Sequence, residues 1–324
     1  MFVASAERLS HDHNIRHPSA GRGPASLAGA KRDTAERANC QQRSVEVRFE
    51  RQGMGQAKNK RALREQFFIE NPLCCFCGGI VAATTQDHYP PRCLFRERKW
   101  PEGYIFLACD SCNAATRDDE NLLSLIMRFS GTEPNIVDHA EFRKAINAVR
   151  NNYPGVLESL KLNSFDKRKA IKSLGLPRLE GLSLAEVPMV RIPTAAKVAF
   201  ERFMFKLGCA LHYKHVGKVL PPDGQVTQQF RTNVMHHKHP LPKEILEMVP
   251  ALAKLQRCNL TLDEQFTYRF NASAEIEAGI FVCVFRLSFS AVLLTIGDPN
   301  ILEDHGNNEF RKMEIKVNRY LRGN

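Results

Sequence analysis

The sequence predicts an α+β protein, in which a small cysteine-rich domain and a helical segment precede a C-terminal α+β domain with an antiparallel sheet. Two Cys-x-x-Cys pairs lie within residues 72–117, helical periodicity runs from Asp118 to about Lys172, and strand-like alternation recurs near the C-terminus. The 324 residues are 43% hydrophobic and 25% charged, which excludes collagen-like, mostly disordered and disulfide-scaffold proteins.

The first 53 residues differ in composition from the rest of the chain. Residues 1–53 contain few large apolar side chains and many Ser, Ala, Gly, Arg and Gln residues, which is typical of disorder. A second interpretation is that Met54 is the true start and that residues 1–53 are an upstream extension. Both interpretations predict that the folded structure begins near residue 54, with residues 54–130 forming the cysteine-rich domain.

Helices and a linker are predicted for residues 131–193. Just before this segment, apolar side chains cluster on one helical face, at Leu122, Leu123, Leu125, Ile126 and Phe129. Phe142, Ile146 and Val149 then repeat at spacings of four and three, which is the helical period. Prolines and glycines gather in residues 173–193, and this indicates a linker between the two domains.

Residues 194–324 are predicted to form the C-terminal α+β domain. Residues 195–218 are apolar on most sides, which indicates a buried helix. Strand-like alternation of apolar and polar side chains follows at residues 266–270, 280–289 and 291–296. Targeting, interaction with a partner and homodimerisation are all compatible with such a domain.

Charge and hydropathy favour a cytoplasmic protein with polyanionic partners. The formal net charge is +11, and a basic surface attracts nucleic acid. The first 30 residues contain no continuous apolar stretch of the kind found in secretory signals. Residues 278–297 are the best candidate for a membrane span, but Arg286 near their centre costs about 2.5–3.5 kcal/mol on insertion scales, so two adjacent strands explain them better. The unpaired pattern of cysteines also favours the cytoplasm.

Four of the ten cysteines have the spacing of a zinc site. They form the pairs Cys74-x-x-Cys77 and Cys109-x-x-Cys112, with 31 residues between the pairs. A two-residue gap lets both thiolates of a turn point at one ion, and two such turns complete a tetrahedral, structural zinc site. Gly78 and Gly79 suit the tight turn after the first pair. Reduced buried cysteines and a redox pair are the alternatives, and Cys75 and Cys93 are expected to lie outside the site.

Two groups of histidines are weaker candidates for metal binding. His236, His237 and His239 stand near prolines and lack a neighbouring cysteine or acidic partner, so they are expected on an exposed loop. His212 and His215 lie three residues apart on the predicted buried helix, where a packed histidine is the ordinary outcome.

Around the cysteines, the chain resembles the HNH endonuclease family in its form with a four-cysteine zinc. The residues that carry the resemblance are CCFCGG, then QDHYPP, then ACDSCNAAT, which span about 45 residues. The resemblance implies a ββα-metal fold, in which a two-stranded hairpin packs on a helix. It also implies that His88 is the general base, and that Asp87 and Asn113 bind a catalytic divalent ion.

The chemistry of these residue types agrees with that implied division of roles. An unperturbed imidazole titrates near pH ~6.5, so His88 can accept a proton from water at neutral pH. A hard ion such as Mg²⁺ prefers oxygen ligands, which Asp87 and Asn113 offer, whereas thiolates suit zinc. The family's central Asn, which orients the His, has no counterpart, because no Asn lies between the two cysteine pairs.

Basic residues follow the Asp-His pair closely. The spacer contains Arg92, Arg96, Arg98 and Lys99, and side chains of this kind contact DNA phosphates. Trp100 is expected to pack, with base stacking as the alternative. The sequence therefore predicts a DNA endonuclease with a structural zinc and a catalytic Mg²⁺ or other divalent ion. The alternative is a non-catalytic zinc-knuckle protein that binds nucleic acid.

Overall fold

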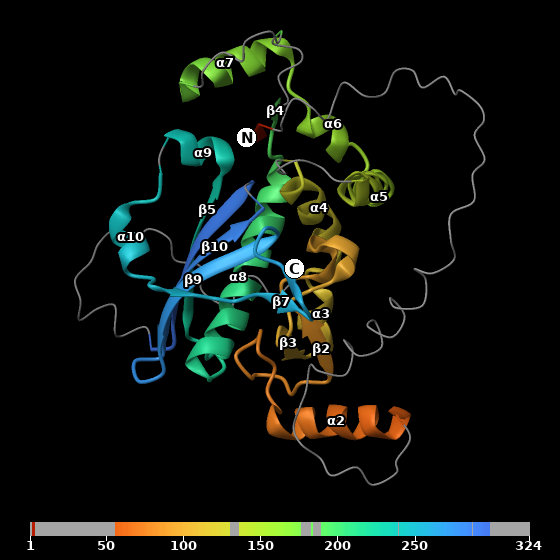
Figure 1. Cartoon of the computed structure of the whole chain (residues 1–324), viewed down its shortest axis with the longest axis vertical. Coiled ribbons are helices and arrows are strands. Elements are labelled where there is room, and N and C mark those ends of the chain that lie inside the picture. The colour runs from red at the N-terminus through yellow and green to blue at the C-terminus, as the bar shows by residue number, and fades with distance from the viewer. Residues whose placement is uncertain are drawn as a thin grey trace, which may run out of the picture.

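The computed structural model of the chain describes residues 2–3, 56–129, 136–175, 183, 189–238, 240–286 and 288–298. It is an α+β structure with an antiparallel sheet in the C-terminal region, as the sequence predicts. One long helix, α8, lies between this sheet and the cysteine-rich segment (Figure 1). The expected disorder or upstream extension of residues 1–53 falls outside the described residues, apart from a two-residue strand.

Helix α8 (Thr194–Val216) is the centre of the hydrophobic core. Fourteen of its residues are buried, on more than one face, which confirms the prediction of a buried helix over residues 195–218. The helix ends at Gly217, whose φ of +82° is the left-handed conformation of a C-cap. Gly208 lets the sheet approach, because a Cβ at this position would lie 2.6 Å from Cγ1 of Val226.

The sheet has five antiparallel strands in the order β5-β11-β10-β9-β6. Their bounds are β5 Gln225–Thr232, β6 Ala251–Leu252, β9 Phe266–Ser273, β10 Ala278–Phe285 and β11 Phe289–Ile296. Phe281 of β10 stands opposite Phe270 on one neighbour and Leu293 on the other. The predicted strand over residues 280–289 ends earlier than expected, because the chain turns at Arg286, where φ is +48°. Phe289 therefore begins β11. Strands β5 and β6 were not predicted from the sequence.

The cysteine-rich segment packs on α8 and joins the same core. It contains helix α2 (Gln56–Glu70), the hairpin strands β2 (Thr85–His88) and β3 (Ile105–Ala108), the short helices η2 (Arg92–Leu94) and η3 (Arg96–Arg98), and helices α3 (Asp110–Ala114) and α4 (Arg117–Met127). The Tyr89 hydroxyl donates to the Phe203 carbonyl over 2.8 Å, and the two rings lie 5.4 Å apart. One cluster of buried residues runs from Cys74 to Leu293, so the two predicted domains share a continuous core.

The remaining elements surround this core. They are β1 (Phe2–Val3), α5 (Ile136–Asn152), α6 (Val156–Leu160), α7 (Ser164–Leu174), β4 (Met189–Val190), α9 (Asn233–Lys238), α10 (Lys243–Glu247), β7 (Gln256–Arg257) and β8 (Leu260–Thr261). Strand β4 lies inside the predicted linker and pairs with β1. Asp118, Asp119 and Glu120 occupy the first turn of α4, as expected from the helix dipole. None of the described helices is both apolar enough and long enough to span a bilayer.

Candidate metal centre and the adjoining basic cluster

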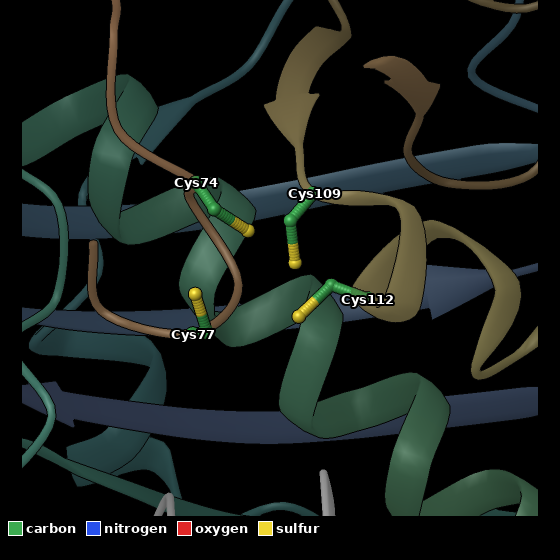
Figure 2. A group of neighbouring side chains, drawn as sticks. All are labelled: Cys74, Cys77, Cys109 and Cys112. Carbon is green, nitrogen blue, oxygen red and sulfur yellow. The ribbon is translucent and has the colours of Figure 1, made fainter. Parts of the chain in front are cut away.

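Four cysteines converge at a buried site that can hold a metal ion. The sulfur atoms of Cys74, Cys77, Cys109 and Cys112 all lie within 4.8 Å of one another. Figure 2 shows the four side chains pointing toward a common centre, two from the turn before the hairpin and two from the end of β3 and from α3. Within the described part of the chain this is the only group of three or more His, Cys, Asp or Glu side chains with such geometry. The donor set, four thiols and no open position, fits a closed zinc site.

The backbone of the first pair forms the turn that its glycines predict. Gly78 and Gly79 have φ values of +69° and +78°, which is left-handed backbone that favours glycine. The Gly79 N–H donates to the Cys74 carbonyl over 3.1 Å and closes the turn. A Cβ on Gly78 would lie 2.6 Å from the backbone nitrogen of Pro222, so glycine also permits close packing on the loop after α8.

The protein environment favours at least one thiolate in this cluster. The hydrogen bond with Cys112 and the nearby backbone N–H groups lower the pKa of Cys74 to about 5. Burial raises the pKa of Cys77 to about 11. Cys75 and Cys93 are not part of the cluster, as predicted, because their sulfurs face the carbonyls of Cys209 and Glu120. An ion bound to all four sulfurs would offset the desolvation of the thiolates.

Asp87 forms a buried ion pair instead of facing open solvent. Its Oδ2 lies 2.6 Å from Nζ of Lys206, and the two side chains are 10% and 1% exposed. The same ammonium donates to the Cys112 carbonyl and to Oγ1 of Thr116, each over 3.1 Å. The rings of Phe76 and Tyr89 line the other side of the ammonium. Lys206 therefore ties α8 to the hairpin and to the second cysteine pair through one charged group.

His88 follows Asp87 on β2 but belongs to different surroundings. Its half-buried ring meets the indole of Trp100 edge to face, with centroids 4.5 Å apart. Burial, Arg92, Arg257 and Arg98 lower the pKa of this imidazole, and the opposing effect of Asp87 is smaller than that of burial. The ring is therefore neutral at pH 7, which is the state in which an imidazole accepts a proton.

Asn113 lies on α3 near the opposite end of β2. Its Nδ2 donates to Oγ1 of Thr85 over 3.0 Å, and that hydroxyl donates in turn to the Ala108 carbonyl. The three residues that the resemblance assigns to one catalytic centre thus have separate partners, namely Lys206 for Asp87, Trp100 for His88 and Thr85 for Asn113. As arranged, these residues do not fit a divalent ion, because the ammonium of Lys206 occupies the carboxylate that would bind it.

The four basic residues of the spacer divide into two pairs. Arg96 lies 3.5 Å from Glu264, and Lys99 lies 2.5 Å from Glu97, so both have acidic partners. The Arg92 guanidinium instead lies over the Trp100 ring, 4.1 Å from its centroid. Arg98 is exposed and lies in left-handed backbone, with a φ of +56°.

Sequence reasoning missed Lys206 and Arg257 next to the predicted site, and it placed Glu120 only in the first turn of a helix. Lys206 is a single charged residue within the apolar stretch of α8, and its position in the sequence does not indicate a partner. Arg257 reaches Trp100 from β7, with its guanidinium carbon 4.2 Å from the ring centroid. Burial raises the pKa of Glu120 to about 7, and Asp87 adds to the effect while Lys206 opposes it. No motif marks these positions, because tertiary packing alone brings them to the hairpin.

The two histidines of α8 pack against residues of the sheet, which is the ordinary outcome that the sequence analysis expects. Nδ1 of His212 lies 2.9 Å from Oγ1 of Thr295, and Nε2 of His215 lies 2.7 Å from the Tyr268 hydroxyl. The side chains of His236 and His237, and all of His239, fall outside the described residues, so that prediction stays open.

Replacement of His215 by Phe is expected to reduce the acid sensitivity of the fold. Burial lowers the pKa of His215 from 6.5 to about 4, so between these values the unfolded chain binds a proton that the folded chain does not. The unfolding free energy therefore falls as the pH falls through this window, by up to about 3 kcal/mol for this group. Urea unfolding at several pH values measures the slope. Tyr268 keeps its hydrogen bond to Tyr104 in the variant, so the substitution leaves no buried hydroxyl without a partner. Equal slopes for wild type and His215→Phe would show that His215 does not cause the acid sensitivity.

Neither family models nor curated proteins nor solved structures match the chain. Its chemistry must therefore be inferred from the residues themselves.

Proposed function

We propose that the chain is a zinc-stabilised endonuclease that hydrolyses DNA phosphodiester bonds with His88 as general base. The observation that carries the proposal is the position of His88, which is half-buried at the end of β2 beside guanidinium groups and has a lowered pKa. Hydrolysis of a phosphodiester requires removal of a proton from water and neutralisation of charge on the phosphate. A neutral imidazole and its neighbouring arginines supply these two functions.

The four-cysteine cluster supports the proposal by holding the hairpin in place. A zinc ion on Cys74, Cys77, Cys109 and Cys112 would join the turn before β2 to the end of β3, so that the hairpin carrying His88 is held at the end where Thr85 pairs with Ala108. Together with helices α3 and α4, the hairpin would then form the ββα arrangement that the resemblance implies. The zinc has a structural role in this proposal, because four thiolates leave no position for a substrate.

The second candidate function is nucleic-acid binding without hydrolysis, and one observation favours it. In the family that the chain resembles, a divalent ion binds to the residues that Asp87 and Asn113 match, whereas here Lys206 pairs with Asp87 and Asn113 bonds to Thr85. We therefore assign no catalytic step to a divalent ion at these residues. A protein that keeps the Asp87–Lys206 ion pair intact would retain the structural zinc and the basic surface. It would lack the catalytic divalent ion.

Replacement of His88 by Ala is expected to abolish cleavage of DNA without affecting the zinc. The imidazole is the only group proposed to take the proton from water, and a general base of this kind contributes about 10²–10⁴-fold to the rate. Nicking of a supercoiled plasmid by the zinc-loaded protein, with and without Mg²⁺ or Mn²⁺, measures the loss. His215→Phe is the matched control, because it also removes one imidazole, whose Nε2 bonds to the Tyr268 hydroxyl of the sheet and not to a residue of the hairpin. Equal cleavage by wild type and His88→Ala would exclude His88, and binding of DNA without cleavage by wild type would favour the second function.

A further inference from the structure

Three basic side chains from distant parts of the chain meet around Trp100. The guanidinium carbons of Arg92 and Arg257 lie 4.1 Å and 4.2 Å from the centroid of its ring, and the His88 ring contacts it at 4.5 Å. Arg92 belongs to η2, whereas Arg257 lies more than 150 residues later, on β7. Trp100 thus serves as the surface on which the basic groups are held, rather than as a free platform for a nucleobase.

Two hydrogen bonds fix Arg257 at this position. The backbone N–H of Glu102 donates to the Gln256 carbonyl over 3.0 Å, and Oε1 of Glu102 accepts from the backbone N–H of Cys258 over 2.9 Å. These bonds clamp both sides of Arg257 to the loop that follows Trp100. The backbone of Arg257 is therefore fixed by the fold, and its guanidinium reaches the Trp100 ring from that position.

The cluster has positive charge without a matching negative charge. No carboxylate of the described residues lies within ion-pairing distance of Arg92, Arg98 or Arg257, although Arg96 and Lys99 beside them are paired. Burial lowers the pKa of Arg92, and the charges of Arg98 and Arg257 add to the effect, so these cations are close enough to repel one another. Nε of Arg92 and Nε1 of Trp100 are buried donors without an acceptor in the described structure. Like charges and unused donors held together are the features of a site that binds an anion.

We propose that Arg92, Arg257 and Trp100, with Arg98 at the rim, form a binding site for a phosphate group of a nucleic-acid backbone beside His88. Guanidinium forks match the tetrahedral oxygens of phosphate, and the Trp100 ring holds two of these forks in place. The choice of nucleic acid as the source of the phosphate rests on the proposed function. The site would place a phosphodiester next to the imidazole that the proposed function requires as a base.

Replacement of Arg257 by Gln tests the site through binding rather than cleavage. Fluorescence anisotropy of the zinc-loaded full chain is measured with a short labelled DNA duplex and, in a second arm, an RNA duplex of the same sequence, without Mg²⁺ or Mn²⁺. We expect Arg257→Gln to weaken binding about tenfold or more, and to reduce the slope of log affinity against log salt by about one. Arg257→Lys keeps the charge but loses the fork, so it should recover only part of the affinity. The arm that shows the loss identifies DNA or RNA as the source of the phosphate.

Arg269→Gln is the matched control, because it removes the same charge from an exposed position on the sheet. Equal affinities for wild type and Arg257→Gln, or equal losses in Arg257→Gln and Arg269→Gln, would overturn the site. Circular dichroism and zinc content confirm that each variant is folded. The outcome is separable from that of the proposed nuclease. If Arg257→Gln loses binding and wild type does not cleave DNA, the phosphate site stands and the nuclease proposal is rejected. If wild type cleaves DNA and Arg257→Gln binds as tightly as wild type, the nuclease proposal stands and the phosphate site is rejected.

Discussion

Replacement of Cys112 by Ser is expected to release one zinc ion per chain and to destabilise the fold strongly. Four sulfurs within 4.8 Å form a closed site only when all four are present. Structural zinc contributes about 10–16 kcal/mol of apparent binding free energy in small zinc peptides, which is comparable with the whole stability of a typical domain. Metal analysis of the purified protein and thermal unfolding with and without a chelator measure both effects.

The consequence should reach beyond the cysteines themselves. Phe76 lies between the two members of the first pair, is 0% exposed, and packs on the rings of Tyr89 and Phe106. These rings belong to the same buried cluster as α8 and the sheet, so loss of zinc is expected to lower the melting temperature of the whole core in one transition. Two separate transitions would instead support independently folded domains.

Cys93→Ser is the matched control for Cys112→Ser. Cys93 lies in the same segment, but its sulfur faces the Glu120 carbonyl outside the cluster, so its substitution should leave one zinc per chain. Two results would contradict a zinc site. One is wild-type protein that contains no zinc and has four titratable thiols, and the other is a disulfide within either cysteine pair, which would indicate a redox centre.

The elements that the sequence predicted are those with a strong local signal. The two Cys-x-x-Cys pairs predicted a four-cysteine cluster from spacing alone, and Gly78 and Gly79 predicted the tight turn after the first pair. The apolar pattern of α8 exceeds what one helical face requires, which indicated burial on several sides. These signals are local because each depends on residues a few positions apart.

The features that the sequence did not predict depend on long-range packing. Strand β5 reads QVTQQFRT, and its Gln residues conceal a strand that is stabilised by pairing with β11. Arg257 lies on a two-residue strand without apolar alternation, and the contacts that bring it to Trp100, such as its clamp to Glu102, come from distant residues. Lys206 is one charge within an apolar helix, and no local pattern pairs it with a residue 119 positions away.

Replacement of Lys206 by Met is expected to destabilise the protein by about 3–5 kcal/mol, because it leaves the buried carboxylate of Asp87 without a cation. Met retains the volume of the side chain and its contacts with Phe76 and Tyr89. The decrease in unfolding free energy therefore measures the loss of the charge and not the creation of a cavity. Urea unfolding measures the change. The double variant Asp87→Asn/Lys206→Met should recover most of it, and equal stability of wild type and Lys206→Met would contradict the buried pair.

The single variant Lys206→Met also tests whether Asp87 can bind a divalent ion. In wild type the ammonium holds the carboxylate, whereas in Lys206→Met a divalent cation can take its place. If Asp87 is a metal ligand, Mg²⁺ should stabilise Lys206→Met by about 2.7 kcal/mol at a concentration 100 times the dissociation constant, and should leave wild type and the double variant unchanged. No stabilisation of Lys206→Met would mean that the hairpin has no oxygen site for the ion. In that case the lysine would be a structural substitute for the metal, and this result would favour the second candidate function, nucleic-acid binding without metal-assisted hydrolysis, over the proposed nuclease.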